Sequence, residues 1–347
     1  MIQQQEETSI AIRSILDLKV SRFIFFFVSL IVAGLLAFRS IPGIFDHNDT
    51  GRYIYTFHEI CSSPMSFDWH KRLTIETYNL LTRPLCLVED NWLYMFLMAL
   101  PVPMGFFLFG TWRGSSSLLL ACSLIGGFAG FEFMTNALRQ SASLFFLLAA
   151  FSFRGRVRWQ IGFAICALLL HESNSIFIPL LFAIEYLNAD TKRIGKGVLY
   201  IILIIAVIGV SLYGLNVLYF GGSGSLADLF DLYERKYEYD QPVWFQLFVM
   251  FPVVWVFLMR WKFSKFELSL EENISFAYSV IVFVVTIIYF PYITYRFAMT
   301  AIALQLYLAM RNNKYVSSAA VWILGGIMLH MMVYAFLSNN VSAVLFG

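Results

Sequence analysis

A stripe of polar side chains lies inside an apolar stretch near the middle of the chain. Asn136, Arg139, Gln140 and Ser143 are spaced at i, i+3, i+4 and i+7, so they share one face of a predicted helix. An arginine at the centre of a membrane helix costs at least about 2.5 kcal/mol, and it is kept where it faces a protein interior, a cavity or an anion. We therefore expect Arg139 to bind an anion, with a structural pair to a carbonyl group or to Glu132 as the alternative.

A second arginine stands in similar surroundings. Tyr292 and Thr300 lie four residues before and after Arg296 on the same helical face, and Tyr295 precedes it directly. A guanidinium near the membrane interface also snorkels toward the headgroups without any other role, and this alternative has equal weight. Arginine holds phosphate groups through bidentate hydrogen bonds, so Arg139 and Arg296 together would bind a diphosphate.

A histidine ends the largely apolar segment that precedes it. His171 follows Trp159–Leu170 and is followed by the polar residues 172–175, which include Ser173. An imidazole in this place would accept a proton as a general base, or donate a hydrogen bond to a phosphate oxygen. Serine and asparagine also cap a following helix, so a histidine that only anchors the turn is an equal alternative.

Another group of reactive side chains follows the first apolar run. Asp46, His47, Asp49 and Arg52 fall within seven residues, and together they would supply acid, base and phosphate-binding groups. A solvated loop carries charges in any case, so an ordinary surface is the alternative. Two carboxylates and one imidazole without further acidic partners make a weak metal site, and we expect neither a metal nor another cofactor.

The composition determines which kind of element positions these residues. Of 347 residues, 59% are hydrophobic and 13% are charged, with a mean hydropathy of +0.72, which excludes a soluble domain. We expect an all-α polytopic membrane protein that forms a single integral domain over 1–347, with about nine spanning helices. The predicted spans are 22–38, 92–110, 115–131, 137–153, 198–220, 242–260, 274–291, 296–310 and 316–337.

The basic residues set the predicted orientation. With the amino terminus in the cytoplasm, five short loops rich in lysine and arginine also lie inside, in agreement with the positive-inside rule. These loops contain Arg113, 154–158, 192–196, 260–265 and 311–314. The loops 39–91 and 221–241 then face the periplasm, as do the turns that precede Arg139 and Arg296.

The segment 159–187 lies between two basic clusters that are both predicted to face the cytoplasm. A continuous spanning helix would place the second cluster outside. Since polar residues interrupt the segment at 171–175, we expect a re-entrant hairpin of two half-helices, 159–170 and 176–187. Non-helical backbone at that depth is tolerated where it is buried in protein or lines a cavity. The hairpin tip would then lie on the same side as the two arginines.

The predicted periplasmic loop 39–91 contains further candidate residues. The sequence Trp69–Leu87 is typical of one or two helices on the membrane surface, where Glu76 would face either a cavity or solvent. Cys61 and Cys86 share this loop, and a disulfide between them suits an oxidising compartment. We expect two free thiols instead, because the other cysteines of the chain serve as small apolar residues in membrane helices.

Taken in order, these motifs resemble the EpsG-like branch of the Wzy polysaccharide polymerases, which are bacterial inner-membrane proteins that extend O-antigen, capsule or exopolysaccharide chains. The resemblance covers residues 40–310. Its matching pieces are Asp46…Asp49 with Tyr53 and Tyr55, then Asn136-Ala-Leu-Arg139-Gln140, then His171-Glu-Ser173, and finally Tyr295-Arg296-Phe297.

The resemblance implies a GT-C-like membrane glycosyltransferase that uses undecaprenyl-diphosphate-linked sugars. The growing glycan would move from its lipid diphosphate onto a sugar hydroxyl of the next lipid-linked repeat unit, and undecaprenyl diphosphate would leave. His171, Asp46 or Asp49 would accept the hydroxyl proton, with Glu76 as a further candidate. The residues expected to bind the substrate or its diphosphate are Arg52, Glu76, Asn136, Arg139, Gln140, Ser173, Tyr295 and Arg296.

Two other functions compete with a polymerase. An O-antigen ligase uses the same donor but transfers the chain to lipid A core. A lipid-glycan flippase or transporter would also place arginines in the membrane, but its polar residues should enter from both sides rather than gather at the external face. The expected partners are lipid-linked oligosaccharides, membrane lipid, a chain-length regulator and a flippase, with no nucleic acid.

Overall fold

The computed structural model describes residues 2–38, 49–62, 73–88, 90–153, 155–189, 243–264, 268–289, 294–311 and 316–345. Every regular element in these ranges is helical, which confirms the predicted all-α class. The first half contains α1 (Ile2–Ala37), α2 (Asp49–Ser62), α3 (Leu73–Thr82), the 3-10 helix η2 (Arg83–Leu87), α4 (Asn91–Ala99), α5 (Pro101–Phe109), α6 (Ser115–Ile125), α7 (Phe128–Thr135) and α8 (Leu138–Ser152). The second half contains α9 (Val157–Leu170), the 3-10 helix η3 (Glu172–Phe177), α10 (Ile178–Ala189), α13 (Val243–Phe263), α14 (Leu270–Tyr289), α15 (Thr294–Arg311) and α16 (Val316–Leu345).

Five of the described helical segments are long and apolar enough to cross a membrane. They are Lys19–Ala37, Asn91–Phe109, Trp244–Phe263, Leu270–Ile287 and Ser318–Phe336. The bent pair α6 and α7 would make a sixth span. Helix α8 is apolar but has only 15 residues, and the predicted span 198–220 lies outside the described residues. The membrane class is therefore established, while the predicted total of about nine spans stays a prediction.

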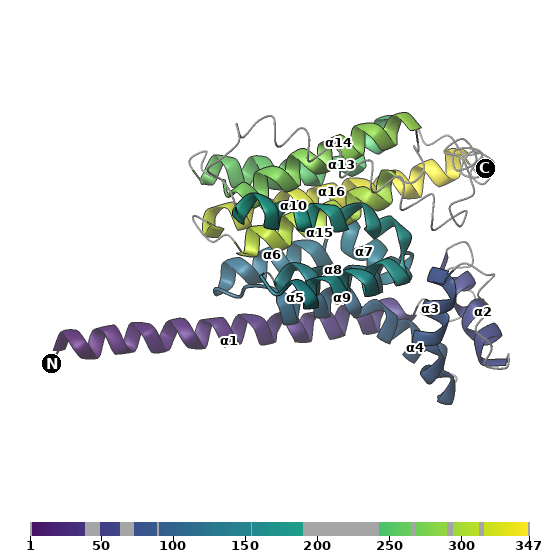
Figure 1. Ribbon diagram of the computed structural model, residues 1–347, viewed down its shortest axis with the longest axis horizontal. Helices are drawn as coiled ribbons and strands as arrows, with labels where there is room; N and C mark the ends of the chain where they lie inside the picture. Colours follow the sequence, from purple (N-terminus) through teal and green to yellow (C-terminus); the bar gives the residue numbers. More distant parts are fainter. Residues whose placement is uncertain are drawn as a thin grey trace.

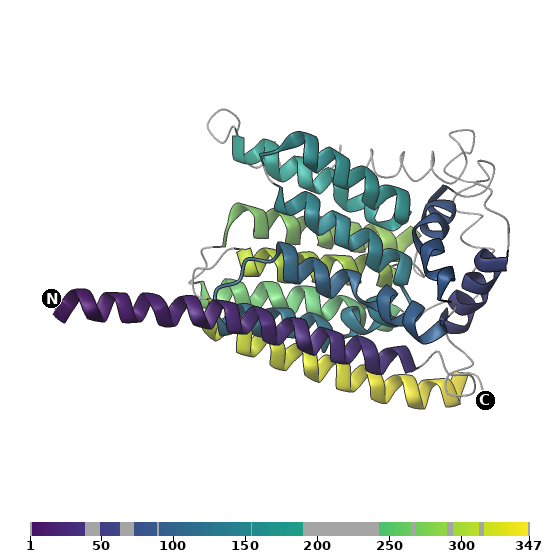
Figure 2. The same ribbon diagram turned by 90° about the horizontal axis from the view of Figure 1, so that it is seen from below.

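The helices of the bundle run roughly along one direction. Figures 1 and 2 show that α1 lies along the bundle and that its amino-terminal part extends past it. Helices α2, α3 and α4 lie at the opposite end of the molecule from the amino terminus (Figure 1). The two ends thus differ, because one bears the amino-terminal extension and the other bears a cap made of α2, α3 and η2.

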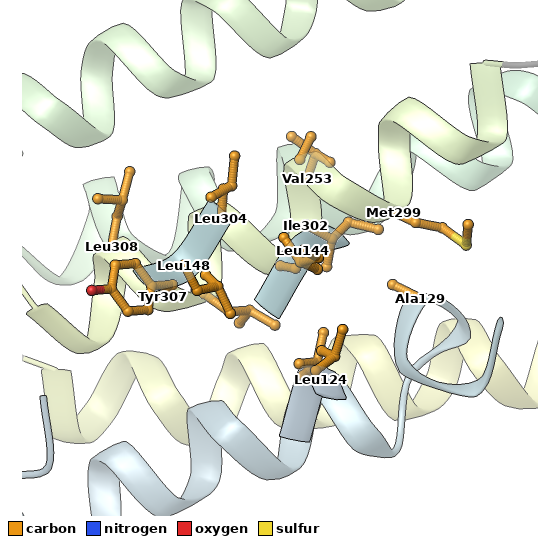
Figure 3. Packing of buried hydrophobic residues seen from close by; sticks show 14 of the residues in the cluster. Leu124, Ala129, Leu144, Leu148, Val253, Met299, Ile302, Leu304, Tyr307 and Leu308 are labelled. Atoms are coloured by element: carbon orange, nitrogen blue, oxygen red, sulfur yellow. The ribbon is translucent and has the colours of Figure 1, made fainter. Parts of the chain in front are cut away.

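Helix α15 forms the centre of the hydrophobic core. Fifteen of its residues are buried, so it is apolar on almost every side, as expected for a helix inside a large bundle. Figure 3 shows its side chains packed between those of α6, α7, α8 and α13, with Ile302 near Leu144 and Tyr307 near Leu148. Burial on all sides fixes the position of the first turn of α15, where Arg296 lies.

The predicted span 115–131 is not a straight helix, because the chain bends by 60° between α6 and α7. Glycine permits the bend. A Cβ atom on Gly127 would lie 2.8 Å from the carbonyl oxygen of Ser123 and 2.5 Å from Cγ2 of Ile327, and one on Gly130 would overlap the carbonyl oxygen of Leu124. The bend aims α7 at the start of α8, where Arg139 lies.

We expect Gly130→Ala to lower the thermal midpoint of the purified protein in detergent. The overlap with backbone atoms cannot be relieved by rotating a side chain, and overpacking of this kind costs about 1–3 kcal/mol. Gly162→Ala on α9 is the matched control, because a Cβ there meets no atom within 4 Å. Equal midpoints for the two variants would show that the bend does not depend on glycine.

Arginine contacts hold helix ends together at the end of the bundle that the charge pattern predicts to be cytoplasmic. Arg260 of α13 donates from Nε to Oε1 of Glu272 at 2.8 Å, and both side chains are buried. Glu272 also accepts from the backbone N–H of Ser269, whose hydroxyl accepts from the N–H of Glu272, which is a capping box at the start of α14. Arg311, at the end of α15, donates to the carbonyl oxygen of Phe151 near the end of α8. These contacts fix the helix ends on the side away from the cap.

Helices α8 and α9 are antiparallel neighbours, since Ser143 near the start of α8 donates to the carbonyl oxygen of Ala167 near the end of α9. Helix α9 ends at Leu170, and His171 has extended backbone angles. Tyr278 of α14 donates to the carbonyl oxygen of Ile176 in η3. The interruption of 159–187 therefore lies beside the start of α8, and its re-entrant course from the cytoplasm stays a prediction.

Candidate active site

The starts of α8 and α15 and the 3-10 turn η3 are joined by a buried polar network. Gln140 donates from Nε2 to the backbone oxygen of Arg296 at 2.8 Å and to Oγ1 of Thr300 at 2.9 Å. Thr300 in turn donates to Oδ1 of Asn174 at 3.0 Å. These bonds bring the polar stripe of α8, the tip after His171 and the turn bearing Arg296 together, as the sequence predicts.

The same network shows that part of the polar stripe holds helices together. Asn174 donates from Nδ2 to Oγ of Ser143 at 2.9 Å and to the backbone oxygen of Gln140 at 3.3 Å. All three side chains are buried. The Nδ2 and hydroxyl protons are thus used within the protein, which suits a structural role for Gln140, Ser143 and Asn174.

Asn136 and Glu132 form a pair at the turn between α7 and α8. Asn136 donates from Nδ2 to both carboxylate oxygens of Glu132, each at 3.2 Å. Glu132 is buried. No ion pair between described residues joins Glu132 to Arg139, so Glu132 instead fixes the residue three positions before Arg139.

Arg139 is the charged member of the stripe, and it carries an unsatisfied donor. Its side chain is half-buried, and its Nη1 atom is buried without a hydrogen-bond partner among the residues that the structure describes. A buried, unpaired donor on a charged group is strongly unfavourable. The arrangement suits an acceptor supplied by a ligand, and an oxyanion matches a guanidinium best.

Arg296 has a different environment. Its Nε donates to the hydroxyl of Tyr295 at 2.9 Å, and its guanidinium carbon lies 5.6 Å from the centre of the same ring. This cation–π contact holds the planar group in one orientation. Arg296 is therefore positioned at the start of α15, next to the backbone contact that Gln140 makes.

His171 is buried and makes a defined contact with Ser173. Its Nδ1 accepts from the backbone N–H of Ser173 at 3.2 Å and lies 2.7 Å from the Ser173 hydroxyl. Because a backbone N–H can only donate, Nδ1 carries no proton, and the neutral ring carries its proton on Nε2. In this tautomer the ring proton is on Nε2, while the nitrogen that would accept a proton faces Ser173.

The cap and α4 together place aromatic side chains next to the start of α8. The hydroxyls of Tyr78 on α3 and Tyr94 on α4 lie 3.1 Å apart, and Phe57 of α2 stacks on Tyr94 with ring centres 4.3 Å apart. All three are fully buried, in one cluster with Leu138 and Leu170. The residues just before Arg139 and His171 thus pack directly against the cap.

The remaining predicted site residues are spread over the cap. Glu76 on α3 is buried, and its carboxylate forms no hydrogen bond or ion pair with a described residue. Arg52 on α2 is exposed. Asp49 begins α2, but its side chain lies outside the description, as does all of Asp46. Within the described ranges, no group of three or more His, Cys, Asp or Glu side chains is arranged to hold a metal ion.

A comparison with known protein families shows where this chain belongs. The model of the EpsG family matches residues 22–345, which is nearly the whole chain. The chain belongs to the EpsG family. No curated protein and no solved structure matches it. Membership supports a polysaccharide polymerase role for this membrane protein.

Sequence reasoning missed several residues that organise the site of this EpsG family member. The sequence indicates only a helix cap at Asn174, yet this residue joins α8, η3 and α15. The pair Tyr78 and Tyr94 comes from two helices on either side of η2. Tyrosine near the end of a membrane helix is a known interfacial signal, but it does not reveal which phenols meet.

The prediction of two free thiols in the cap is wrong. Cys61 and Cys86 form a disulfide with their Cα atoms 5.3 Å apart. Cys122 and Cys166 are free, but they lie inside the bundle, so their state does not predict the state of cysteines in the cap. Cys61 lies in the last turn of α2 and Cys86 lies in η2, so the bond ties α2 to the rest of the cap.

We expect purified wild-type protein to resist alkylation at Cys61 and Cys86 until it is reduced. A bond that closes a loop of this length, with a sequence separation of 25, contributes about 3 kcal/mol to stability. The double variant Cys61→Ser/Cys86→Ser should therefore expose the α2 segment to protease, while Cys122→Ser should not. Labelling of both cap thiols without reduction would contradict this bond.

Proposed function

We propose that this protein polymerises a polysaccharide by moving the growing glycan from undecaprenyl diphosphate to the next lipid-linked repeat unit. A hydroxyl oxygen of the acceptor sugar attacks the anomeric carbon of the donor sugar, and the bond from that carbon to the diphosphate oxygen breaks. The hydroxyl proton passes to a base, and undecaprenyl diphosphate leaves. Family membership supports the polymerase class, and the site residues support this donor.

The unpaired Nη1 of Arg139 is the observation on which the proposal depends. Negative charge grows on the leaving diphosphate as the sugar departs, and a preorganised donor in a water-poor site stabilises that charge. Arg296 lies at the start of the neighbouring helix, with its backbone oxygen bonded to Gln140. The two guanidinium groups together would neutralise a diphosphate better than either alone.

His171 takes the role of a donor in this proposal. Because its Nδ1 accepts from Ser173, its Nε2–H is suited to bind a phosphate oxygen. The base is then one of the carboxylates, of which Asp46, Asp49 and Glu76 are the candidates. Glu76 has a buried side chain with no hydrogen-bond or ion-pair partner among the described residues, so no described group of the protein occupies its carboxylate oxygens.

We place the protein in the bacterial inner membrane with the cap in the periplasm. The arginine contacts at the opposite end agree with the positive-inside rule. A disulfide persists in an oxidising compartment and is rare in the cytosol, so the Cys61–Cys86 bond supports this orientation. A flippase would supply the lipid-linked repeats on this side, and a chain-length regulator is a natural partner.

The two alternatives predict other outcomes. A ligase uses the same lipid diphosphate donor, but it needs lipid A core as acceptor and produces no ladder from repeats alone. A flippase would leave the glycan unchanged. The motif pieces Asn136-Ala-Leu-Arg139-Gln140 and His171-Glu-Ser173 favour the polymerase.

The direct test is to incubate purified protein with lipid-linked repeat units and separate the products on a gel. A polymerase produces a ladder in which each rung is one repeat longer. A single product that appears only when lipid A core is added would indicate a ligase. Unchanged repeats that move across a vesicle membrane would indicate a flippase.

A further inference from the structure

The pair of buried phenols at Tyr78 and Tyr94 contains one proton more than it uses. Their hydroxyl oxygens lie 3.1 Å apart, and either atom serves as the donor. Each side chain is 1% exposed. A phenol has one proton to donate, so the accepting phenol keeps its own proton. No acceptor for that second proton occurs in the part of the chain that the structure describes.

The surplus proton lies near the unpaired guanidinium of Arg139. Leu138 packs in the same buried cluster as both tyrosines, which places the first turn of α8 beside them. The charge of Arg139 acts on the Tyr78 hydroxyl, where it lowers the pKa. Two elements of the site thus present donors. One is Nη1 of Arg139, which has no described partner, and the other is a phenol of the pair, which forms no hydrogen bond with a described residue other than the second phenol.

Tyr78 stays protonated at neutral pH. Burial raises the pKa of the Tyr78 hydroxyl well above its usual value, and the neighbouring phenols of Tyr94 and Tyr53 add to the increase. These effects outweigh the opposing charge of Arg139. The phenol pair is therefore a lasting source of one hydrogen-bond donor and does not become an anion that pairs with Arg139.

We propose that the Tyr78–Tyr94 pair donates its second proton to the same diphosphate that Arg139 binds. Nη1 of Arg139 and the second phenol proton are both donors, so a ligand that contacts both must be an acceptor, and the oxygens of a diphosphate accept from several donors at once. The two tyrosines then stabilise the charge that grows on the leaving oxygen. This inference rests on the proposed function, because it adds two binding residues to the same diphosphate site.

Single and double variants show whether the tyrosine pair donates to the diphosphate or only holds α3 and α4 together. In Tyr78→Phe or in Tyr94→Phe the mutual hydrogen bond is lost, but the remaining phenol keeps a proton for the ligand. We expect each single variant to bind a short-chain polyprenyl diphosphate with nearly wild-type affinity. The double variant should bind it roughly tenfold to a hundredfold more weakly, the effect of losing one hydrogen bond to a charged group.

A pair that only holds α3 and α4 together predicts a different pattern of affinities, because either single variant already removes the hydrogen bond between the two tyrosines. Affinity losses that are equal in the single and double variants would overturn the proposal, as would a double variant that binds like wild type. Tyr307→Phe is the matched control, since Tyr307 is also a buried phenol but lies on α15 near Arg311. Its affinity should not change.

A competing lipid shows whether the site is specific for the diphosphate. Phosphatidylglycerol in the same micelles should not compete, and competition at equal concentration would identify the site as one for anionic phospholipid.

If the double variant loses its fold, 3-fluorotyrosine at position 78 keeps both hydroxyls and makes the phenol a stronger donor. Tighter diphosphate binding supports the proposal, and unchanged affinity overturns it. Wild-type protein that binds the diphosphate but makes no ladder would contradict the proposed function and leave this inference standing.

Discussion

Arg139→Ala should reduce polymer formation by about a hundredfold or more, while the protein remains folded and abundant. The variant removes a donor to the leaving diphosphate, and loss of such a group costs a few kcal/mol in the transition state. Arg139→Lys should rescue poorly, because an ammonium presents a point charge instead of a planar fork. Ladder intensity and the rate of repeat consumption give the measurement.

Arg158→Ala is the control for this experiment, since Arg158 is an exposed arginine at the start of α9. Its activity should equal that of wild type. Arg296→Ala should resemble Arg139→Ala if both arginines bind the diphosphate. Near-normal ladders from Arg139→Lys and Arg296→Lys would show that both arginines are structural.

The second large effect is expected at His171. His171→Ala should lose roughly tenfold to a hundredfold in activity, because the Nε2–H donor to a charged oxygen is lost. His171→Gln should keep a substantial part, since a carboxamide N–H replaces that donor. Ser173→Ala should have a small effect, because the backbone N–H that fixes Nδ1 is retained.

A general base at His171 predicts the opposite result. His171→Ala and His171→Gln would then both be inactive, although donor lipid still binds. The activity of wild-type protein would fall on acidification, since a protonated imidazole accepts no further proton. Loss of activity in Glu76→Gln, Asp46→Asn or Asp49→Asn with His171→Gln active would place the base in the cap or in the loop before it.

Sequence patterns predict the helical class and the face of α8 well, because both depend on local periodicity. Gln140 and Ser143 do contact the same residue, Asn174, just after the break at His171, but Asn136 lies in the turn before α8 and not on its face. Which of these residues is bonded depends on distant partners. Gln140 donates from Nε2 to Thr300, 160 residues away, while Nη1 of Arg139 is left without a described partner.

Other features had a local signal that periodicity alone does not show. The adjacent glycines at 126 and 127 mark the bend between α6 and α7, because glycine permits close backbone contacts. Ser269 and Glu272 are spaced as a capping box before α14. The Tyr78–Tyr94 pair and the Cys61–Cys86 bond have no such signal, since each joins two separate elements of the cap region.

The most direct test of the account is to count the lipid diphosphate released for each sugar linkage formed. Purified wild-type protein should release one undecaprenyl diphosphate per repeat added to the ladder, and Arg139→Ala should release almost none. Polymer that grows without release of lipid diphosphate, or release at the wild-type rate in Arg139→Ala, would contradict transfer from a lipid diphosphate held by Arg139.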